Sequence, residues 1–359
     1  MTLLSRRAAF LTAILLLATL VLVYPPTRLI SLLVPGWSPS IWVILGLLGL
    51  PVSLRLLHER TSPRWAAWSR MVMAVVMTWL GICFMMLTIL LPAEFILLTG
   101  LFAPQTIGQC VLALVTVLSL YSIFNALHLH VRTVEIKVDQ TVHSAISGTA
   151  LVQISDVHIG SRQPGLLAPI VAQVNALNPD YTLITGDLID MQGIDEEQLA
   201  ALGELESPSL FCIGNHERYV DLEDICRRLQ NLGIQVLRNA TVRKNDFQFI
   251  GIDDAESKQQ VGNEISKLKP APDAYRVLLY HRPDGAQQAA DWGANLMLTG
   301  HTHRGQIFPF NLLVKRFFPL LHQLYQIDDM HLYVSPGTGT WGPVMRLGSK
   351  CEITLFKLR

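Results

Sequence analysis

The hydrophobic positions of the chain follow two patterns, and the change comes near residue 130. Before that point, four long apolar runs with few internal charges cover residues 8–24, 41–57, 71–91 and 107–127. A helix that crosses a hydrocarbon core of about 30 Å needs roughly 20 apolar residues, which the last two runs supply. The first two runs are shorter, and Pro51 interrupts the second. We therefore predict a membrane anchor, an all-α bundle of four transmembrane helices, over residues 1–130.

After residue 130, short apolar runs alternate with amphipathic stretches. The runs predict strands over residues 150–155, 181–185, 210–213, 248–252, 277–280, 296–299, 332–334 and 353–358. The amphipathic stretches predict helices over residues 166–177, 196–205, 222–232 and 263–268. Strands that alternate with helices indicate an α/β sandwich with buried sheets. Residues 131–359 should therefore form one α/β domain.

Composition supports this division and excludes some functions. Half of the 359 residues are hydrophobic and only 16% are charged, which is typical of a partly membrane-embedded chain. The formal net charge is zero, and neither half has the dense basic face of a nucleic-acid binder. The five cysteines form no CxxC pair, which favours a reducing compartment.

The basic residues of the first half predict an orientation. Three clusters flank the apolar runs: Arg6 and Arg7, then Arg55, Arg60, Arg64 and Arg70, then Arg132 and Lys137. Positive residues favour the cytoplasmic side, so both termini and the α/β domain are expected there. An alternative is that residues 5–11, SRRAAFL, form a twin-arginine export signal, but the three later runs favour the anchor.

The apolar runs themselves contain no paired charges. Arg28 and Glu94 are the only charged residues in the two remaining connections, and we expect both in loops. Transporters usually bury charged groups within their spans. The helices are therefore expected to be an anchor, or a platform that recruits a lipid.

Polar residues follow five of the predicted strands, at the point where each strand ends. They are Asp156 and His158, then Asp187, then Asn215 and His216, then His281, and finally His301 and His303. Because ligands of α/β sheets bind at the carboxyl ends of strands, these side chains are expected to meet in one cleft. Carboxylate, imidazole and amide groups without thiolates suit Mn, Fe or Zn. The set is too large for one tetrahedral ion and fits two ions that share a carboxylate.

These motifs carry a family resemblance. Asp156-x-His158, Gly186-Asp187, Gly214-Asn215-His216-Glu217, His281 and Gly300-His301-Thr302-His303 resemble the signature of the calcineurin-like metallophosphoesterases. The likeness covers residues 131–359 and implies a four-layer αββα sandwich. The C-terminal stretch from Tyr333 resembles a bacterial membrane-associated branch that includes some UDP-diacylglucosamine hydrolases. That branch implies a bacterial, membrane-associated protein, and the four apolar runs then predict a multi-pass protein of the inner membrane.

The resemblance also implies roles for individual residues. Asp156, His158 and His303 would hold a first divalent ion, Asn215, His281 and His301 a second, and Asp187 would bridge them. Manganese is the expected metal, with iron or zinc as alternatives. A hydroxide between the two ions would attack phosphorus, and His216, oriented by Asp156 or a neighbouring carboxylate, would assist the leaving oxygen. Arg282 and Arg304 depart from the branch pattern and are candidate substrate-binding residues.

The segment 307–325 bears on the substrate. It follows the last predicted ligand and is rich in Phe and Leu, with Lys315 and Arg316 in the middle. It is either a buried insertion or a lip that dips into the membrane and brings the cleft to a lipid headgroup. The expected function is hydrolysis of a phosphodiester or pyrophosphate bond in a lipid-linked or membrane-proximal substrate. The alternative is an inactive, regulatory binding protein on the same fold.

Overall fold

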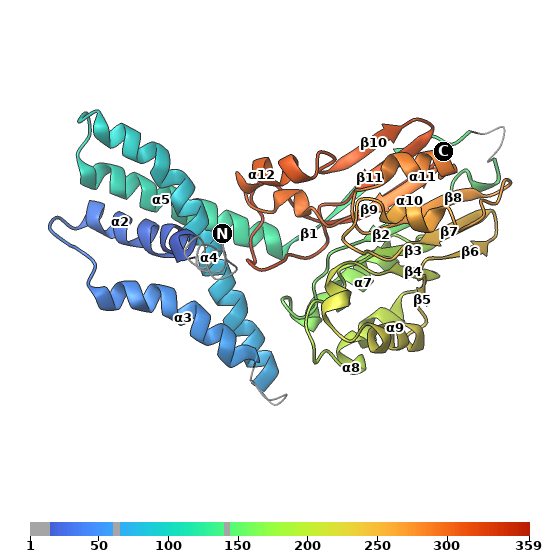
Figure 1. The fold of residues 1–359 in the computed structure, drawn as a ribbon, viewed down its shortest axis with the longest axis horizontal. Coiled ribbons are helices and arrows are strands. Elements are labelled where there is room, and N and C mark those ends of the chain that lie inside the picture. Colours follow the sequence, from blue (N-terminus) through green and yellow to red (C-terminus); the bar gives the residue numbers. More distant parts are fainter. Residues whose placement is uncertain (1–14, 60–64, 140–143) are drawn as a thin grey trace, which may run out of the picture. The chain divides into compact units, whose positions relative to one another are not determined.

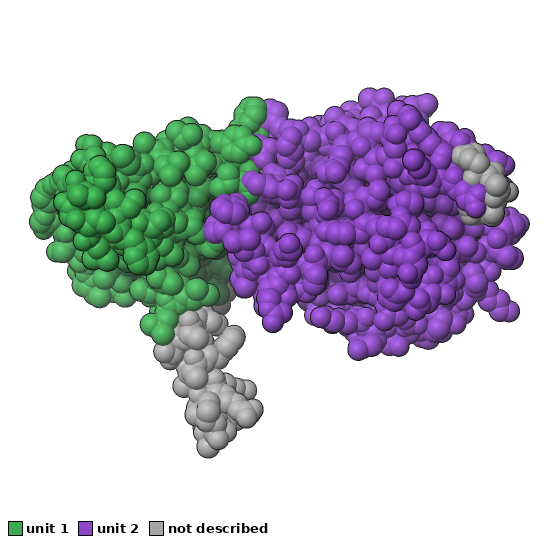
Figure 2. All heavy atoms as spheres, turned by 90° about the horizontal axis from the view of Figure 1, so that it is seen from above, with its two compact units in different colours: residues 1–124, 342–347 green, residues 125–341, 348–359 purple. Residues whose placement is uncertain are grey.

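The computed structural model describes residues 15–59, 65–139 and 144–359. The chain divides into two compact units, which Figure 2 colours separately. Residues 1–124 and 342–347 form the helical unit, and residues 125–341 and 348–359 form the α/β unit. The predicted export motif at residues 5–11, together with Arg60 and Arg64, lies outside the described residues.

The helical unit contains long apolar helices (Figure 1). A short π-helical turn, η1 (Thr19–Val23), leads into α2 (Tyr24–Leu33), which is followed by α3 (Ile41–Glu59), α4 (Ala66–Leu98) and α5 (Pro104–Leu127). Three stretches are long and apolar enough to cross a membrane: Leu15–Leu33, Ala67–Leu98 and Pro104–Leu127. The apolar helix Ile41–Leu57 is shorter than this. Among the described residues, the predicted count of four spans is therefore not confirmed.

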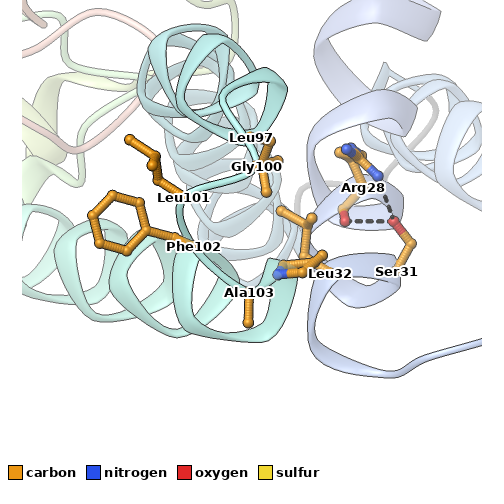
Figure 3. Close-up of a pocket in the computed structure, with 9 residues that line it drawn as sticks. Arg28, Ser31, Leu32, Leu97, Gly100, Leu101, Phe102 and Ala103 are labelled. Carbon is orange, nitrogen blue, oxygen red and sulfur yellow. Dashed lines mark hydrogen bonds between the residues drawn. The ribbon is translucent and has the colours of Figure 1, made fainter.

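A charged pair joins two of these helices, and the expectation of charge-free spans was wrong. Arg28 lies in α2, and Glu94 lies in α4, which continues beyond Pro92 instead of ending in a loop there. The Arg28 guanidinium donates to both Glu94 oxygens, from Nε at 2.6 Å and from Nη2 at 2.8 Å, and the Tyr24 hydroxyl donates to Glu94 at 2.9 Å. Arg28 also borders a cavity of about 620 Å³ that Ser31, Leu97 and Phe102 line with it (Figure 3).

A separate piece of sequence completes the helical unit. Residues 342–347 lie between two strands of the α/β unit in the sequence, yet they pack with the helices. The Val344 N–H donates to Thr78 Oγ1 at 3.1 Å, and the Arg346 N–H donates to the Ser122 carbonyl at 2.9 Å. The sequence did not indicate this insertion, because its six residues have no distinctive pattern.

Two six-stranded sheets form the centre of the α/β unit. The first has the order β1-β12-β2-β3-β4-β5 and the second has the order β10-β11-β9-β8-β7-β6. The strands are β1 (Leu129–Ile136), β2 (Ala150–Ile154), β3 (Tyr181–Thr185), β4 (Ser209–Cys212), β5 (Gln235–Val236), β6 (Ala240–Lys244), β7 (Phe247–Gly251), β8 (Tyr275–Leu279), β9 (Leu296–Thr299), β10 (Gln323–Ile327), β11 (Met330–Val334) and β12 (Cys351–Leu358).

Alternation along the strands divides the core into three layers of side chains. In β3, Leu183 points into the layer between the two sheets, while Ile184 packs with α7 (Leu167–Ala176) and α9 (Leu222–Asn231) on the outer face. The second sheet covers its own outer face with α10 (Gln260–Ile265) and α11 (Ala286–Trp292). Neighbouring residues of a strand face opposite sides, so each sheet is buried on both faces. The α/β fold with two sheets is confirmed.

The strand directions determine where the cleft lies. Strands β2, β3 and β4 run parallel to one another in the first sheet, and β8 and β9 run parallel in the second. Parallel neighbours end at the same edge of a sheet, so the polar segments after these five strands meet. Gln153 connects the two sheets there, donating from Nε2 to Thr185 Oγ1 at 2.7 Å and to the Thr299 carbonyl at 2.9 Å.

Candidate metal centre

The five strand ends bring the predicted ligands into two adjoining groups. Asp156, His158 and His303 form one group, and Asp187, His281 and His301 form the other. Within each group the potential ligand atoms all lie within 4.8 Å of one another. Together these two groups contain all the predicted ligands except Asn215, and the ligand roles themselves stay predictions.

The distances within the cleft place Asp187 between the two groups. The His158 and His303 Nε2 atoms are 3.0 Å apart, and His301 Nδ1 lies 3.2 Å from His281 Nε2. Asp187 Oδ2 is 3.0 Å from His281 Nε2 and 3.9 Å from His158 Nε2. One carboxylate oxygen thus faces a histidine of each group, as a bridging ligand would.

The donor atoms fit divalent cations. Asn215, the predicted amide ligand, has a buried Oδ1 with no hydrogen-bond partner among the described residues. A buried amide oxygen without a partner is costly, and a cation in the cleft would satisfy it. Carboxylate oxygens, imidazole nitrogens and an amide oxygen are ligands that manganese, iron and zinc all accept.

Hydrogen bonds behind the histidines orient their rings. His281 Nδ1 lies 2.9 Å from the Thr185 carbonyl, so this nitrogen carries the proton and Nε2 presents its lone pair to the cleft. For His158 the contact is ionic, since its Nδ1 lies 3.3 Å from Asp190 Oδ2. Asp190 is itself fixed by Ser161, whose N–H and hydroxyl donate to its two oxygens at 2.8 and 2.5 Å. The sequence analysis missed Asp190, whose only signal is its place three residues after Asp187.

Five of the seven predicted ligands have an unusual backbone conformation. Asp156, His158, Asp187, His301 and His303 have φ between 47° and 70°, the left-handed region that non-glycine residues rarely adopt. Each bend turns a side chain sharply from the end of a strand toward the cleft. Such strain persists only where the surroundings enforce it, and it gathers at functional sites.

Two motif glycines are needed because the loops pass very close to ligand carboxylates. A Cβ at Gly214 would lie 2.2 Å from Asp187 Oδ1, and a Cβ at Gly300 would lie 2.2 Å from Asp156 Oδ2. Any larger residue would push a carboxylate out of the cleft. These clashes explain why glycine precedes Asn215 and His301 in the motifs.

A buried carboxylate holds two of the ligand loops together. Glu217 accepts four backbone hydrogen bonds, from the N–H groups of Asp187, Leu188, Ile189 and Gly214, at 2.7–3.0 Å. The loop after β3 and the loop after β4 are thus joined through one side chain that has no exposed surface. Glu217 is a positioning residue, and its place in the Gly214–Glu217 motif is explained by these bonds.

Charges in the cleft shift the pKa values of its members strongly. Burial disfavours the charged form of His281, but Asp187 and Asp156 outweigh this and raise its pKa to about 10. Burial opposes ionisation of Asp187 as well, yet His281 and His158 hold its pKa well below the usual range. Burial, together with the charge of Asp187, raises the pKa of Glu217 to about 7. Clustered shifts of this kind are typical of functional sites, and a bound cation would replace the histidine proton.

His216 lies at the mouth of the cleft. Its N–H donates to Asp187 Oδ1 at 2.9 Å, and its ring Nε2 lies 3.9 Å from Asp187 Oδ2. Of the two predicted alternatives, Asp156 or a neighbouring carboxylate, the structure thus shows the second, Asp187, facing His216. Burial lowers the pKa of His216, which keeps the imidazole neutral near pH 7 and able to donate one N–H.

The two candidate substrate-binding arginines differ. Arg282 donates from Nε to the buried Asp254 at 2.7 Å and lies 3.3 Å from Glu256, so its charge is compensated. Arg304 follows His303 directly and is exposed. Within the described parts of the chain, no carboxylate is paired with it. Arg304 is thus the better placed of the two to meet a substrate phosphate.

Comparisons with known proteins agree with this geometry. A family model described as calcineurin-like phosphoesterase matches residues 149–305. An uncharacterized metallophosphoesterase of Campylobacter jejuni is 30% identical over 254 residues, which cover 68% of each chain. The chain belongs to the calcineurin-like metallophosphoesterases.

A second relative is named as a transmembrane protein. A "Transmembrane protein with metallophosphoesterase domain" of Bos taurus is 36% identical over 269 residues. These cover 68% of this chain and 60% of the bovine protein, so the match leaves more than a third of that relative unaccounted for. A metallophosphoesterase of Aquifex aeolicus, also uncharacterized, is 30% identical over 227 residues, which cover 58% of this chain and 84% of that protein.

Replacing Glu217 should destabilise the metallophosphoesterase unit. Glu217→Gln keeps the size of the side chain but turns an amide N–H₂ toward backbone donors, leaving buried N–H groups without acceptors. We expect a loss of about 2–4 kcal/mol in the free energy of unfolding and a fall of roughly 5–10 °C in Tm. Thermal unfolding of the metal-free protein in detergent measures this. The exposed Glu206→Gln is the control, and equal Tm values for the two variants would contradict the role of Glu217.

Replacing Asp190 should weaken metal binding without unfolding the protein. Asp190→Asn removes the charge that orients His158, and partners of this kind typically contribute 10–100-fold to metal affinity. Manganese titration followed by calorimetry should show a loss of that size, and Tm of the metal-free protein should change little. Asp329→Asn, in the exposed turn between β10 and β11, is the matched control. Unchanged affinity in Asp190→Asn would show that His158 does not depend on it.

Proposed function

We propose that this protein is a membrane-anchored metallophosphoesterase that hydrolyses a phosphodiester or pyrophosphate bond in a lipid-linked substrate. The observation that carries the proposal is the pair of donor groups that share Asp187, at the edge where both sheets end. A pair of divalent ions is the occupant that this shared carboxylate favours. Manganese is our proposal for the metal, because the donor set contains oxygen and imidazole but no thiolate.

The residues of the cleft have separable tasks in this proposal. When bound, a pair of divalent ions supplies a hydroxide nucleophile at neutral pH and stabilises negative charge on the phosphate. Asp156, His158 and His303 would hold one side of the centre, Asn215, His281 and His301 the other, and Asp187 both. His216 would donate its N–H to the leaving oxygen, and Arg304 would bind a phosphate oxygen.

An exposed apolar helix beside the cleft supports a lipid substrate. Helix α12 (Phe310–Phe317) packs against the short turn η7 (His303–Gly305), and none of its residues is buried. Residues 308–317 are not a buried insertion, because Phe308, Phe310, Leu312, Leu313 and Phe317 are 45–63% exposed. Exposed apolar side chains next to Lys315 and Arg316 are typical of segments that lie in a membrane interface.

The proposed location is the bacterial inner membrane with the catalytic unit on the cytoplasmic side. Three apolar helices and the basic clusters support the anchor and its direction. The fourth span, over Ile41–Leu57, is part of this proposal, since an even number of crossings returns the chain to the side where it started. An inactive binding protein is the second candidate. Hydrolysis that depends on the metal in the experiment below would exclude it.

The first experiment tests the metal centre. Purified protein should bind about two manganese ions per chain, and chelation should abolish hydrolysis of a chromogenic diester. Asp187→Asn should lower activity more than His158→Asn, because one change weakens both sites. His216→Ala should keep its manganese and lose about 10²–10⁴-fold in rate. Activity that survives chelation would contradict the dinuclear centre, and metal loss in His216→Ala would make His216 a ligand.

The second experiment tests the apolar helix. Each acyl methylene buried against α12 should contribute about 0.8 kcal/mol, so an acylated substrate should have a much lower KM than its deacylated headgroup. The triple variant Phe308→Ser, Leu312→Ser, Phe317→Ser should erase most of this difference and spare hydrolysis of a small diester. Phe318 is left intact because its ring packs 5.0 Å from that of His301.

The matched control for α12 keeps its apolar character. Phe308→Leu with Phe317→Leu should retain most of the KM difference between acylated and deacylated substrates. Equal KM values for both substrates in the wild type would eliminate the lipid proposal and leave α12 as a structural element.

The third experiment tests orientation. A reporter that is active only outside the cytoplasm, fused after Arg359, should give no signal, whereas a cytoplasmic reporter at the same position should be active. The reverse result would place the metallophosphoesterase unit outside and favour export directed by residues 5–11.

A further inference from the structure

Exposed aromatic rings stand on the His216 side of the cleft. Among the large hydrophobic side chains described between residues 128 and 359, the exposed ones lie in three places apart from Val131: at Tyr219, along residues 308–317, and at Trp341. Trp341 is 54% exposed, although exposing an indole forfeits a large hydrophobic gain. Its ring centroid lies 5.9 Å from that of His216, at an angle of 69°.

A side chain from a ligand loop fixes the backbone of Trp341. Gln306 Nε2 donates to the Trp341 carbonyl at 3.0 Å, and the Trp341 N–H donates to Gln306 Oε1 at 3.0 Å. Gln306 comes three residues after His303, has a φ of 53°, and accepts a hydrogen bond at its carbonyl from Ser349 Oγ at 2.9 Å. These two hydrogen bonds from the Gln306 side-chain amide hold the Trp341 backbone in place, while the indole stays exposed to solvent.

Tyr219 provides a second fixed ring. Its centroid lies 5.7 Å from that of His216, at an angle of 79°, and its side chain is 60% exposed. The Tyr219 hydroxyl donates to Glu256 at 2.6 Å, and Glu256 is also paired with Arg282. Polar contacts thus hold both aromatic residues, and neither ring is covered by the core.

We infer that Trp341, with Tyr219, forms a subsite for a planar ring in the leaving group of the substrate. This inference rests on the proposed function, in which His216 assists the departing oxygen, because a leaving group next to His216 lies within reach of both rings. Aromatic rings that are fixed in position are suited to stacking with planar rings, because stacking depends more on ring geometry than on additional buried surface area. Acyl chains would instead contact the aliphatic and aromatic side chains of α12.

The substrate class follows from the two surfaces together. One side of the scissile phosphate would carry an apolar tail toward α12, and the other would carry a planar ring toward Trp341. A nucleobase or aryl group meets the second requirement. Gln306 is a positioning residue for this subsite, since it touches Trp341 and not the substrate.

The experiment compares three phosphonates that do not require hydrolysis. Phenylphosphonate, cyclohexylphosphonate and methylphosphonate are titrated by calorimetry into the full-length, manganese-loaded protein in detergent. Phenyl and cyclohexyl groups are similar in size, but only phenyl is planar. The wild type should bind phenylphosphonate about tenfold more tightly than cyclohexylphosphonate. Trp341→Ala should abolish that ratio, Trp341→Phe should restore most of it, and Gln306→Ala should reduce it.

Controls separate this subsite from folding and from the metal centre. Trp42→Ala removes an indole that is 77% exposed in the helical unit and should keep the wild-type ratio. Manganese content is measured for every variant. If all three phosphonates bind and the phenyl and cyclohexyl affinities are equal, the planar-ring subsite is overturned while the proposed function stands. If Trp341→Ala keeps the tenfold ratio, the assignment to Trp341 is overturned.

Binding and hydrolysis then report on different proposals. A phenyl preference that disappears in Trp341→Ala supports the subsite, whether or not the wild type hydrolyses a diester. Absence of hydrolysis would contradict only the proposed function. If none of the three phosphonates binds the manganese-loaded protein, no phosphate is anchored beside His216, and both proposals are overturned.

Discussion

The buried carboxylate of Glu217 is the contact on which the centre depends. Two strands of the first sheet, β3 and β4, end side by side, and each passes into a loop that carries a predicted ligand. Neither loop is regular structure, so its N–H groups need acceptors from elsewhere. Glu217 supplies one acceptor group to four of them and so fixes Asp187 with respect to Asn215. An uncompensated carboxylate could not be buried there, and the four donors make its burial possible.

The small size of the cleft explains the strained backbone. Asp187, His158 and His301 must turn back from strands of two different sheets toward one point only a few ångströms wide. The left-handed conformation makes this turn within a single residue, and Gly214 and Gly300 leave room for the carboxylates that result. The cost of each bend is of order 1–3 kcal/mol. The rigid double-sheet core, packed on both faces of each sheet, supplies the stability that offsets it.

Much of this arrangement was predictable because it depends on local sequence patterns of apolar and polar residues. The strands that precede the predicted ligands are short apolar runs, three of them followed within two residues by glycine, and each was predicted to within two residues of its observed ends. Strands β1, β5, β6 and β10 were missed because they are the edge strands of the two sheets, so most of their residues are exposed or half-buried and form no apolar run. Arg28 and Glu94 were placed in loops because the predicted apolar runs end at residues 24 and 91, whereas α2 covers Tyr24–Leu33 and α4 continues to Leu98. Contacts between distant segments, such as Asp190 with His158 or Gln306 with Trp341, have no local pattern and required the structure.

The connection between β11 and β12 brings several of these features together. Gly339 donates its N–H to the Asp156 carbonyl at 3.0 Å, and a Cβ there would lie 2.2 Å from the Val157 carbonyl oxygen, so the connection begins against a ligand loop. Two residues later Trp341 is held by Gln306, and residues 342–347 then pack within the helical unit. Residues 339–347 therefore contact the loop of Asp156 first, then contribute Trp341 beside His216, and then pack with the apolar helices. The residue that we assign to leaving-group recognition, Trp341, is therefore joined directly in sequence to the segment that packs within the helical unit.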